Sequence, residues 1–97
     1  MPADFSYGFS HKIIRIAEIL PGHRVRLVFD QGEERLLDMS PLLQKPIFVS
    51  LGDEGNFAKA EIGTDEDGRE IGTLEWRVCE VWPDISPDYA YSLSIPI

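Results

Sequence analysis

Hydrophobic and polar residues alternate most regularly in the stretch Arg24–Asp38, near the middle of the first half of the chain. Val25, Leu27 and Phe29 fall at every second position, between mostly polar neighbours. This is the period of a strand that has one dry face. We therefore predict a strand here and place Leu27 and Phe29 in the core.

A turn and a second strand follow this pattern directly. Asp30-Gln31-Gly32 breaks the alternation, and Gly32 can take the positive φ that closes a three-residue hairpin loop. Leu36 and Leu37 come next as neighbours, so the second strand carries an apolar residue on each face. The pattern predicts a hairpin that is covered on both sides.

The segment before this hairpin, Lys12–Leu20, is rich in isoleucine at both odd and even positions. We predict a strand with both faces covered. Pro21-Gly22-His23 then forms a turn into the central hairpin. Three consecutive strands joined by short turns predict an antiparallel meander.

The character of the chain changes after Asp38. Ser40-Pro41 places a capping residue before a proline, which predicts one short helical turn that ends before Pro46. Asp53 is the expected cap of a second helical turn. Ile47, Phe48 and Leu51 are expected to supply apolar contacts, and Phe48, Leu51 and Phe57 are expected to pack onto the sheet.

A second hairpin is indicated by Asp67-Gly68, which lies between the alternating stretches 59–62 and 70–76. We expect 78–82 to continue the sheet and the proline-containing segment 83–97 to consist of turns. The whole chain, 1–97, is thus predicted to be a single α+β domain. Its antiparallel or mixed sheet is built from hairpins, with one or two short helical turns.

The first ten residues carry aromatics at alternate positions, Phe5, Tyr7 and Phe9. A terminal segment is often frayed. Three aromatics are costly to leave in water, so we favour an aromatic arm, 1–10, that docks along a sheet edge of this molecule or of a second copy in a homodimer.

Charge and composition narrow the functional classes. The net charge is −8, and residues 39–97 hold four basic against eleven acidic residues. An acidic surface argues against direct binding of nucleic acid and suits solubility or a basic partner. The chain shows no membrane-spanning run and no signal-peptide pattern at its start, so we expect a cytoplasmic protein without membrane contact.

Few residues suggest a metal site or catalysis. The acidic run Asp65-Glu66-Asp67-Gly68 resembles part of a calcium loop, but Gly63 and Leu74 occupy two of the required ligand positions. An acidic turn is the better interpretation. We assign no catalytic, cofactor-binding or metal-binding residue and expect no cofactor.

Two further groups of residues could suggest catalysis, but each has a structural role that suits it better. Cys79 with either histidine would offer a nucleophile and a base, but its valine neighbours predict a buried, unreactive thiol. Asp84 and Asp88 are four residues apart, and a paired acid and base would need a pocket. We expect Asp84 to accept hydrogen bonds from following amides, and Ser86-Pro87-Asp88 to start a turn.

Two tryptophans, Trp76 and Trp82, are expected in the core or at its rim. Tryptophan is enriched at binding hot spots. An exposed tryptophan would therefore be the first candidate for a contact with a partner.

The order of these features resembles that of a small bacterial family, domain of unknown function 2442, from about Ile13 to Tyr91. The features that carry the resemblance are, in order, a strand with Ile16, Arg26-Leu27-Val28-Phe29-Asp30-Gln31-Gly32, Leu36-Leu37-Asp38-Met39, Leu42-Leu43, Pro46-Ile47-Phe48, Leu51, Phe57, Gly72-Thr73-Leu74-Glu75-Trp76 and Asp84-Ile85-Ser86-Pro87-Asp88. In the family pattern one tryptophan is soon followed by proline. Here 77–81 separates Trp76 from Trp82-Pro83, so either can be that tryptophan.

The resemblance implies an α+β domain without an established enzyme activity. Family members are often encoded beside another small domain in an arrangement that looks like a toxin–antitoxin pair. Some longer relatives carry a DNA-binding helix-turn-helix, for which we expect no room here.

The sequence and the resemblance together predict a non-enzymatic protein-binding module of a bacterial cytoplasm. Its partner would be a small basic protein, such as the product of an adjacent gene, toward which the chain acts like an antitoxin. Two alternatives are a small ligand-binding or enzymatic domain with a pocket near Trp76 and Trp82, and a self-associating dimerisation domain.

Overall fold

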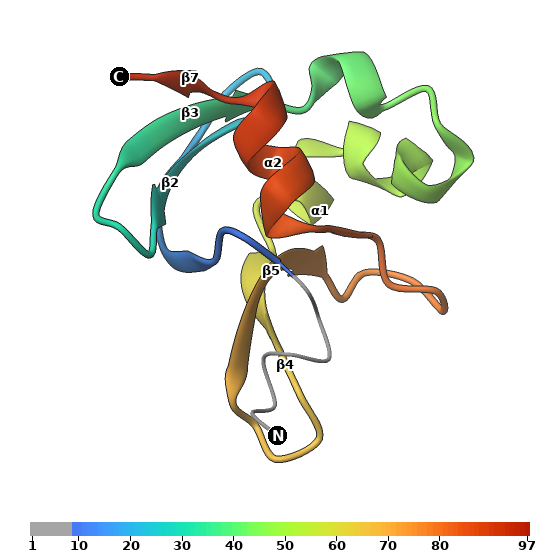
Figure 1. The fold of residues 1–97 in the computed structure, drawn as a ribbon. Coiled ribbons are helices and arrows are strands. Elements are labelled where there is room, and N and C mark those ends of the chain that lie inside the picture. The colour runs from blue at the N-terminus through green and yellow to red at the C-terminus, as the bar shows by residue number, and fades with distance from the viewer. Residues whose placement is uncertain (1–8) are drawn as a thin grey trace.

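The computed structural model describes residues 9–97 and has two antiparallel sheets with short helices (Figure 1). One sheet has the order β1-β2-β3-β7, from Ile13–Leu20, Arg24–Phe29, Glu34–Asp38 and Ile95–Pro96. The other has the order β4-β5-β6, from Ala60–Thr64, Glu70–Trp76 and Asp84–Ile85. The helices are α1 (Glu54–Phe57) and α2 (Pro87–Leu93), with 3-10 helices η2 (Ser40–Leu42) and η3 (Pro46–Gly52). The predicted α+β class is confirmed.

The central hairpin, β2–β3, forms as its pattern predicts. Leu27 and Phe29 are at most 1% exposed, and both lie in the core. Gly32 has a φ of +86° and its N–H donates to the carbonyl of Phe29, which closes the loop. Leu37 is fully buried, but Leu36 is only half-buried, so the second face of β3 is partly covered.

Strand β1 pairs with β2 through a register that shifts twice. Bulges lie between Ile13 and Arg15 and between Ile16 and Glu18. As a result Ile13, Ile16 and Ile19 all pair with buried residues of β2, although they are three positions apart. A bulge inserts one extra residue and reverses the side of the residues that follow. Isoleucine at both parities therefore marks one buried face, and the prediction of two covered faces was wrong.

The core lies where the two sheets and the short helices meet. Strand β1 contacts β4 and β5, and helix α2 packs against β3 and β5. The buried apolar residues include members of every strand except β4 and β7: Ile13, Val25, Leu27, Phe29, Leu37, Met39, Leu42, Phe48, Leu51, Phe57, Leu74, Trp76, Ile85 and Ala90. Phe48, Leu51 and Phe57 thus contact the core as predicted, whereas Ile47 is exposed.

The helical segments follow the capping signals only in part. The Asp53 carboxylate accepts a hydrogen bond from the N–H of Asn56 and caps α1, as predicted. The turn predicted after Ser40-Pro41 forms as η2 and ends before Pro46, but its N-cap is Met39 and not Ser40. Pro46 itself begins η3, because proline suits a first helical position. Residues 87–93, expected to be turns, form α2, whose N-cap is Ser86.

The predicted aromatic arm falls mostly outside the described residues. Phe5 and Tyr7 precede residue 9, and only Phe9 is described, as a half-buried residue. Docking of the arm on a sheet edge stays a prediction.

Candidate functional site

The loop between β5 and β6, residues 77–83, returns the chain to the sheet. The N–H of Trp76 donates to the carbonyl of Pro83 at 2.9 Å, which ties the two ends of the loop together. The loop is not a strand, so the expected continuation of the sheet over 78–82 was wrong. The sheet resumes only at Asp84–Ile85, after Pro83 has turned the chain.

Cys79 lies within this loop and is exposed, not buried as its valine neighbours suggested. Its S–H donates to the carbonyl of Val81 at 2.9 Å, and its sulfur lies 3.9 Å from the hydroxyl of Ser50. Its neighbour Val78 is half-buried against the core, while Val81 is exposed. The loop is therefore held by polar contacts, and only one of its valines reaches the interior.

The two tryptophans have different environments. Trp76 is fully buried, its ring is stacked on Phe57 at 5.6 Å, and its indole N–H donates to the carbonyl of Phe57 at 2.9 Å. Trp82 is 49% exposed. Trp76 is therefore a core residue, and Trp82 is the tryptophan that presents a surface.

Arg77 fixes the ring of Trp82 from one side. Its guanidinium carbon lies 4.6 Å from the ring centroid, within the range of a cation–π contact. The same guanidinium lies 2.9 Å from Glu75 and 3.4 Å from Glu61. The hydrogen bond to Glu75 is the main cause that raises the pKa of Arg77 above its ordinary value. Trp82 thus lies beside a connected group of charges.

This group carries more negative than positive charge. Glu61 and Glu75 pair directly across β4 and β5, and Arg77 is the cation that bridges them. Glu80 and Asp84 are exposed close by in the sequence. Trp82, Arg77, Glu61, Glu80 and Asp84 form what we call the Trp82 surface, and the buried Glu75 holds Arg77 from below it.

Two exposed apolar side chains lie on this loop and on the 3-10 helix that contacts it. Val81 is 73% exposed next to Trp82. Val49 of η3 is also exposed, and η3 is joined to the loop by the contact between Ser50 and Cys79. An aromatic residue with an apolar surround and a polar rim is the usual anatomy of a protein-binding site.

The acidic turn of the β4–β5 hairpin is shaped by its own side chain. One carboxylate oxygen of Asp65 accepts hydrogen bonds from the N–H groups of Asp67 and Arg69, both at 2.9 Å. This arrangement is that of an acidic turn. Within residues 9–97, no group of three or more His, Cys, Asp or Glu side chains is placed to hold a metal ion.

A second cluster, which the sequence did not suggest, fastens α2 to the first sheet. The ring of Tyr91 is stacked on His11 at 3.9 Å, and the guanidinium of Arg35 lies 4.1 Å from its centroid. Its hydroxyl donates to Glu33 at 2.6 Å. Arg35 also donates to Glu33 at 2.6 Å and to the side chain and carbonyl of Ser94.

The charges of this second cluster shift two pKa values. The hydrogen bond from Tyr91, and then Arg35, hold the pKa of Glu33 below its ordinary value. The same bond to Glu33 raises the pKa of Tyr91. Residues from three separate segments meet here, so we interpret the cluster as a structural contact that holds α2 against the first sheet. The sequence alone does not show that these residues are neighbours.

The residues considered for catalysis, Cys79 with either histidine and Asp84 with Asp88, form no hydrogen bond or ring contact with one another in the described part of the chain. His11 is stacked on Tyr91, and His23 lies 3.1 Å from the carbonyl of Gly52. Neither contact involves Cys79. Asp88 accepts hydrogen bonds from the N–H groups of Ser10 and His11, so it fastens the start of the described chain to α2.

Two expectations for the segment 84–88 were wrong. Ser86-Pro87-Asp88 starts a helix rather than a turn, because the Ser86 hydroxyl accepts a hydrogen bond from the N–H of Tyr89. The exposed side chain of Asp84 accepts no hydrogen bond within residues 9–97, contrary to expectation.

Within the described part of the chain, no helix combines the length and the apolar character needed to cross a membrane. Comparison of the chain with protein-family models, with curated proteins and with solved structures finds no match. The resemblance to domain of unknown function 2442 therefore stays a prediction.

Proposed function

We propose that this chain is a non-enzymatic protein-binding module of a bacterial cytoplasm, and that Trp82 anchors its contact with a basic protein. The observation that carries the proposal is the half-exposed ring of Trp82, held by Arg77 in a loop whose ends are tied together. A rigid aromatic side chain gives large contact area at small entropic cost.

The excess of acidic residues around Trp82 supports a basic partner. Residues 39–97, which include the Trp82 surface, carry seven more acidic than basic residues, from eleven against four. Complementary charge raises the rate of association and disfavours partners that are themselves acidic. It also disfavours a phosphate backbone, so the proposal excludes direct binding of nucleic acid.

The predicted family arrangement suggests which basic protein to test. The resemblance to domain of unknown function 2442 implies a partner encoded by the adjacent gene, for which this chain would act like an antitoxin. The burial of Trp76 counts against the alternative pocket at that residue, because a fully buried ring offers no surface to a ligand.

Calorimetry with the purified product of the adjacent gene tests the proposal. We expect binding, and we expect Trp82→Ala to weaken it by about tenfold or more, as hot-spot residues do. Tyr89→Ala is the matched control, because Tyr89 is 42% exposed and belongs to α2. Absence of binding, or equal loss in both variants, would contradict the proposal.

A further inference from the structure

A shallow groove lies between the β1–β2 turn and helix α1, and none of its lining residues belongs to the Trp82 surface. Its volume is about 320 Å³, which is at the small end of ligand-binding sites. The lining is apolar apart from one carboxylate: Ile19, Leu20, Pro21, Glu54, Phe57 and Ala58. The groove is therefore large enough for a side chain and too small for most cofactors.

The wall formed by the turn is fixed by His23. This residue has a φ of +61°, in the left-handed region that is unfavourable for side chains other than glycine. Its ring nitrogen Nε2 lies 3.1 Å from the carbonyl of Gly52, and its ring meets Phe57 edge-on at 5.3 Å. The turn is thus attached to the segment that carries the opposite wall, although its backbone is strained.

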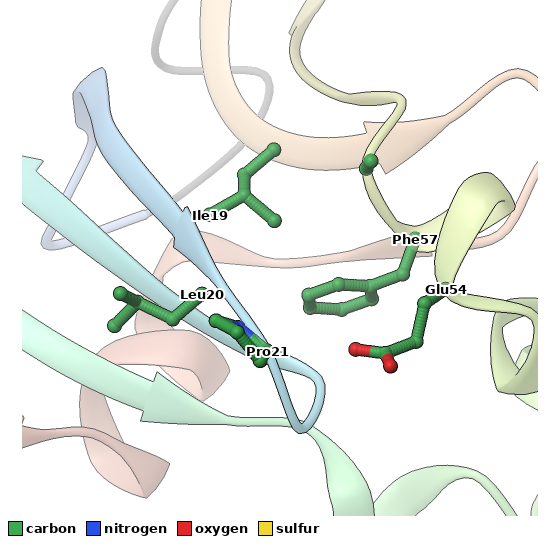
Figure 2. Close-up of a pocket in the computed structure, with 6 residues that line it drawn as sticks. Ile19, Leu20, Pro21, Glu54 and Phe57 are labelled. Carbon is green, nitrogen blue, oxygen red and sulfur yellow. The ribbon is translucent and has the colours of Figure 1, made fainter.

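The single carboxylate of the groove, that of Glu54, is also oriented by the turn. Its Oε1 accepts a hydrogen bond from the N–H of Gly22 at 3.0 Å. Figure 2 shows this carboxylate and the ring of Phe57 directed toward Pro21 across the groove. Within residues 9–97 no cation forms an ion pair with Glu54, and its Oε2 accepts no hydrogen bond. An oriented, unpaired charge therefore borders an apolar surface.

These features match a flexible aliphatic chain that ends in a cation. We propose that the groove binds a lysine or arginine side chain of a basic partner protein. The methylene stem lies along Leu20 and Pro21, which are half-buried and exposed, and the cationic head donates to Oε2 of Glu54. Long basic side chains commonly bury their stems on apolar surface in this way. Hydrogen bonds between two charged groups are stronger than neutral ones.

The charge of the whole chain favours a protein as the source of this cation. At a net charge of −8, the chain attracts basic proteins and repels acidic ones. The groove shares no residue with the Trp82 surface, so it would add a second contact. Its test is therefore independent of Trp82, and either proposal can fail alone.

Nuclear magnetic resonance titration of the ¹⁵N-labelled chain tests the groove. The probes are acetyl-Ala-Arg-Ala-amide and acetyl-Ala-Lys-Ala-amide, with the norleucine tripeptide as the uncharged control of similar shape. We expect saturable shifts at the amides of Leu20, Gly22 and Phe57. The basic peptides should bind about two- to fivefold more tightly than the control, as for an exposed ion pair.

Two variants separate the ion pair from general attraction. Glu54→Gln keeps an oxygen that can accept from Gly22, so it preserves the turn, and it should remove the preference for the basic peptides. Glu66→Gln removes the same charge from an exposed residue outside the groove and should leave that preference unchanged.

Three results would overturn the proposal. The first is the absence of saturable shifts at the groove. The second is equal affinity for the norleucine and arginine peptides in the unaltered chain. The third is much tighter binding of free spermidine than of either basic peptide, which would assign the groove to small polyamines.

Discussion

The β2–β3 and β4–β5 hairpins differ in how their buried and exposed residues are arranged along the strands. In the β2–β3 hairpin the alternate residues Val25, Leu27 and Phe29 are buried along the full length of the strand. The hairpin lies inside a sheet, with β1 on one side and β7 on the other. Its side chains therefore serve the core from end to end.

The β4–β5 hairpin is divided into two halves. At its base Leu74 and Trp76 are fully buried. Its turn, residues 65–69, extends beyond the other described elements in Figure 1 and carries three acidic residues. The loop that follows β5 then presents Trp82.

This difference separates stability from binding along the chain. Substitutions in β2–β3 or at the base of β4–β5 should act on the free energy of unfolding. Substitutions at the acidic turn should act on association and leave the fold intact. The following predictions test this division, beginning with the largest effect.

Leu27→Ala should lower the free energy of unfolding by about 2–5 kcal/mol, because it leaves a cavity in a close-packed core. Urea denaturation monitored by circular dichroism measures the loss. Ile14→Ala is the matched control, since Ile14 is on the neighbouring strand but is 50% exposed. Its effect should stay within about 0.5 kcal/mol. Similar losses in the two variants would show that the burial pattern does not decide stability.

Two left-handed glycines allow a sharper comparison of the hairpins. Gly32, in the β2–β3 turn, and Gly72, in β5, have φ values of +86° and +85°. A Cβ on Gly32 would meet nothing within 4 Å, whereas one on Gly72 would lie 2.7 Å from the Cβ of Lys12 and 3.0 Å from its Cα. Alanine adds backbone strain of order 1 kcal/mol at both positions. At Gly72 it adds a clash as well.

We therefore expect Gly72→Ala to lower the melting temperature clearly more than Gly32→Ala does. Scanning calorimetry of the two variants against the unaltered chain gives the ranking. The reverse ranking would mean that the segment containing Lys12 can move away at little cost. Gly32→Val should also melt several degrees lower, because a β-branched residue is poorly accommodated at positive φ.

The sequence predicted those parts of the fold whose signals are local. Alternation located Leu27 and Phe29, and turn chemistry located Gly32 and Asp67-Gly68, because each signal depends on residues close together. The bulges of β1 could not be predicted, since they depend on how Ile16 pairs with another strand. Isoleucine at both parities was consistent with either two covered faces or one bulged face.

Helix α2 shows a local signal that was overlooked. Ser86-Pro87 has the same form as Ser40-Pro41, where a helical turn was predicted. The later prolines favoured an interpretation as turns. For the candidate site, the sequence predicted only that an exposed tryptophan would contact a partner, and not which tryptophan is exposed. Which tryptophan is exposed depends on Phe57, whose ring and carbonyl hold Trp76 in the core.

The cluster around Tyr91 gives a smaller, pH-dependent effect. The pKa of Glu33 is lowered in the folded chain, so its bonds stabilise the fold at pH values above the unfolded pKa of the carboxyl group. This contribution is lost as the pH falls through the lower, folded value. The raised pKa of Tyr91 acts at the opposite end, where its contribution is lost as the pH rises through the folded value.

Tyr91→Phe should remove the bond to Glu33 and make the loss of melting temperature on acidification shallower. Melting between about pH 7 and pH 3 spans the titration of carboxyl groups. Tyr89→Phe is the control, because Tyr89 is an exposed tyrosine of the same helix. Asp38, whose pKa is also lowered, mainly by Ser40, should contribute equally in both variants. Identical acid profiles would contradict this role of Tyr91.

The smallest effect on stability is expected at the acidic turn, and there the association rate should change instead. Asp65 is kept because its carboxylate shapes the turn, and Glu66→Gln with Asp67→Asn removes two exposed charges. The free energy of unfolding should change by less than about 0.5 kcal/mol. Association with the proposed partner, a basic protein encoded by the adjacent gene, should slow, and its dependence on ionic strength should become less steep.

A matched variant shows whether the position of these charges matters. Glu18→Gln with Asp30→Asn also removes two exposed acidic charges, but from β1 and from the β2–β3 turn. It should change the salt dependence less than the variant of the turn does, if the partner approaches the β4–β5 hairpin. Duplex DNA, titrated in parallel at physiological salt, should show no appreciable affinity for any of these proteins. Equal effects of the two variants would mean that the net charge alone, and not its position, attracts the partner. Tight DNA binding would require a basic surface and would contradict an acidic binding surface around Trp82.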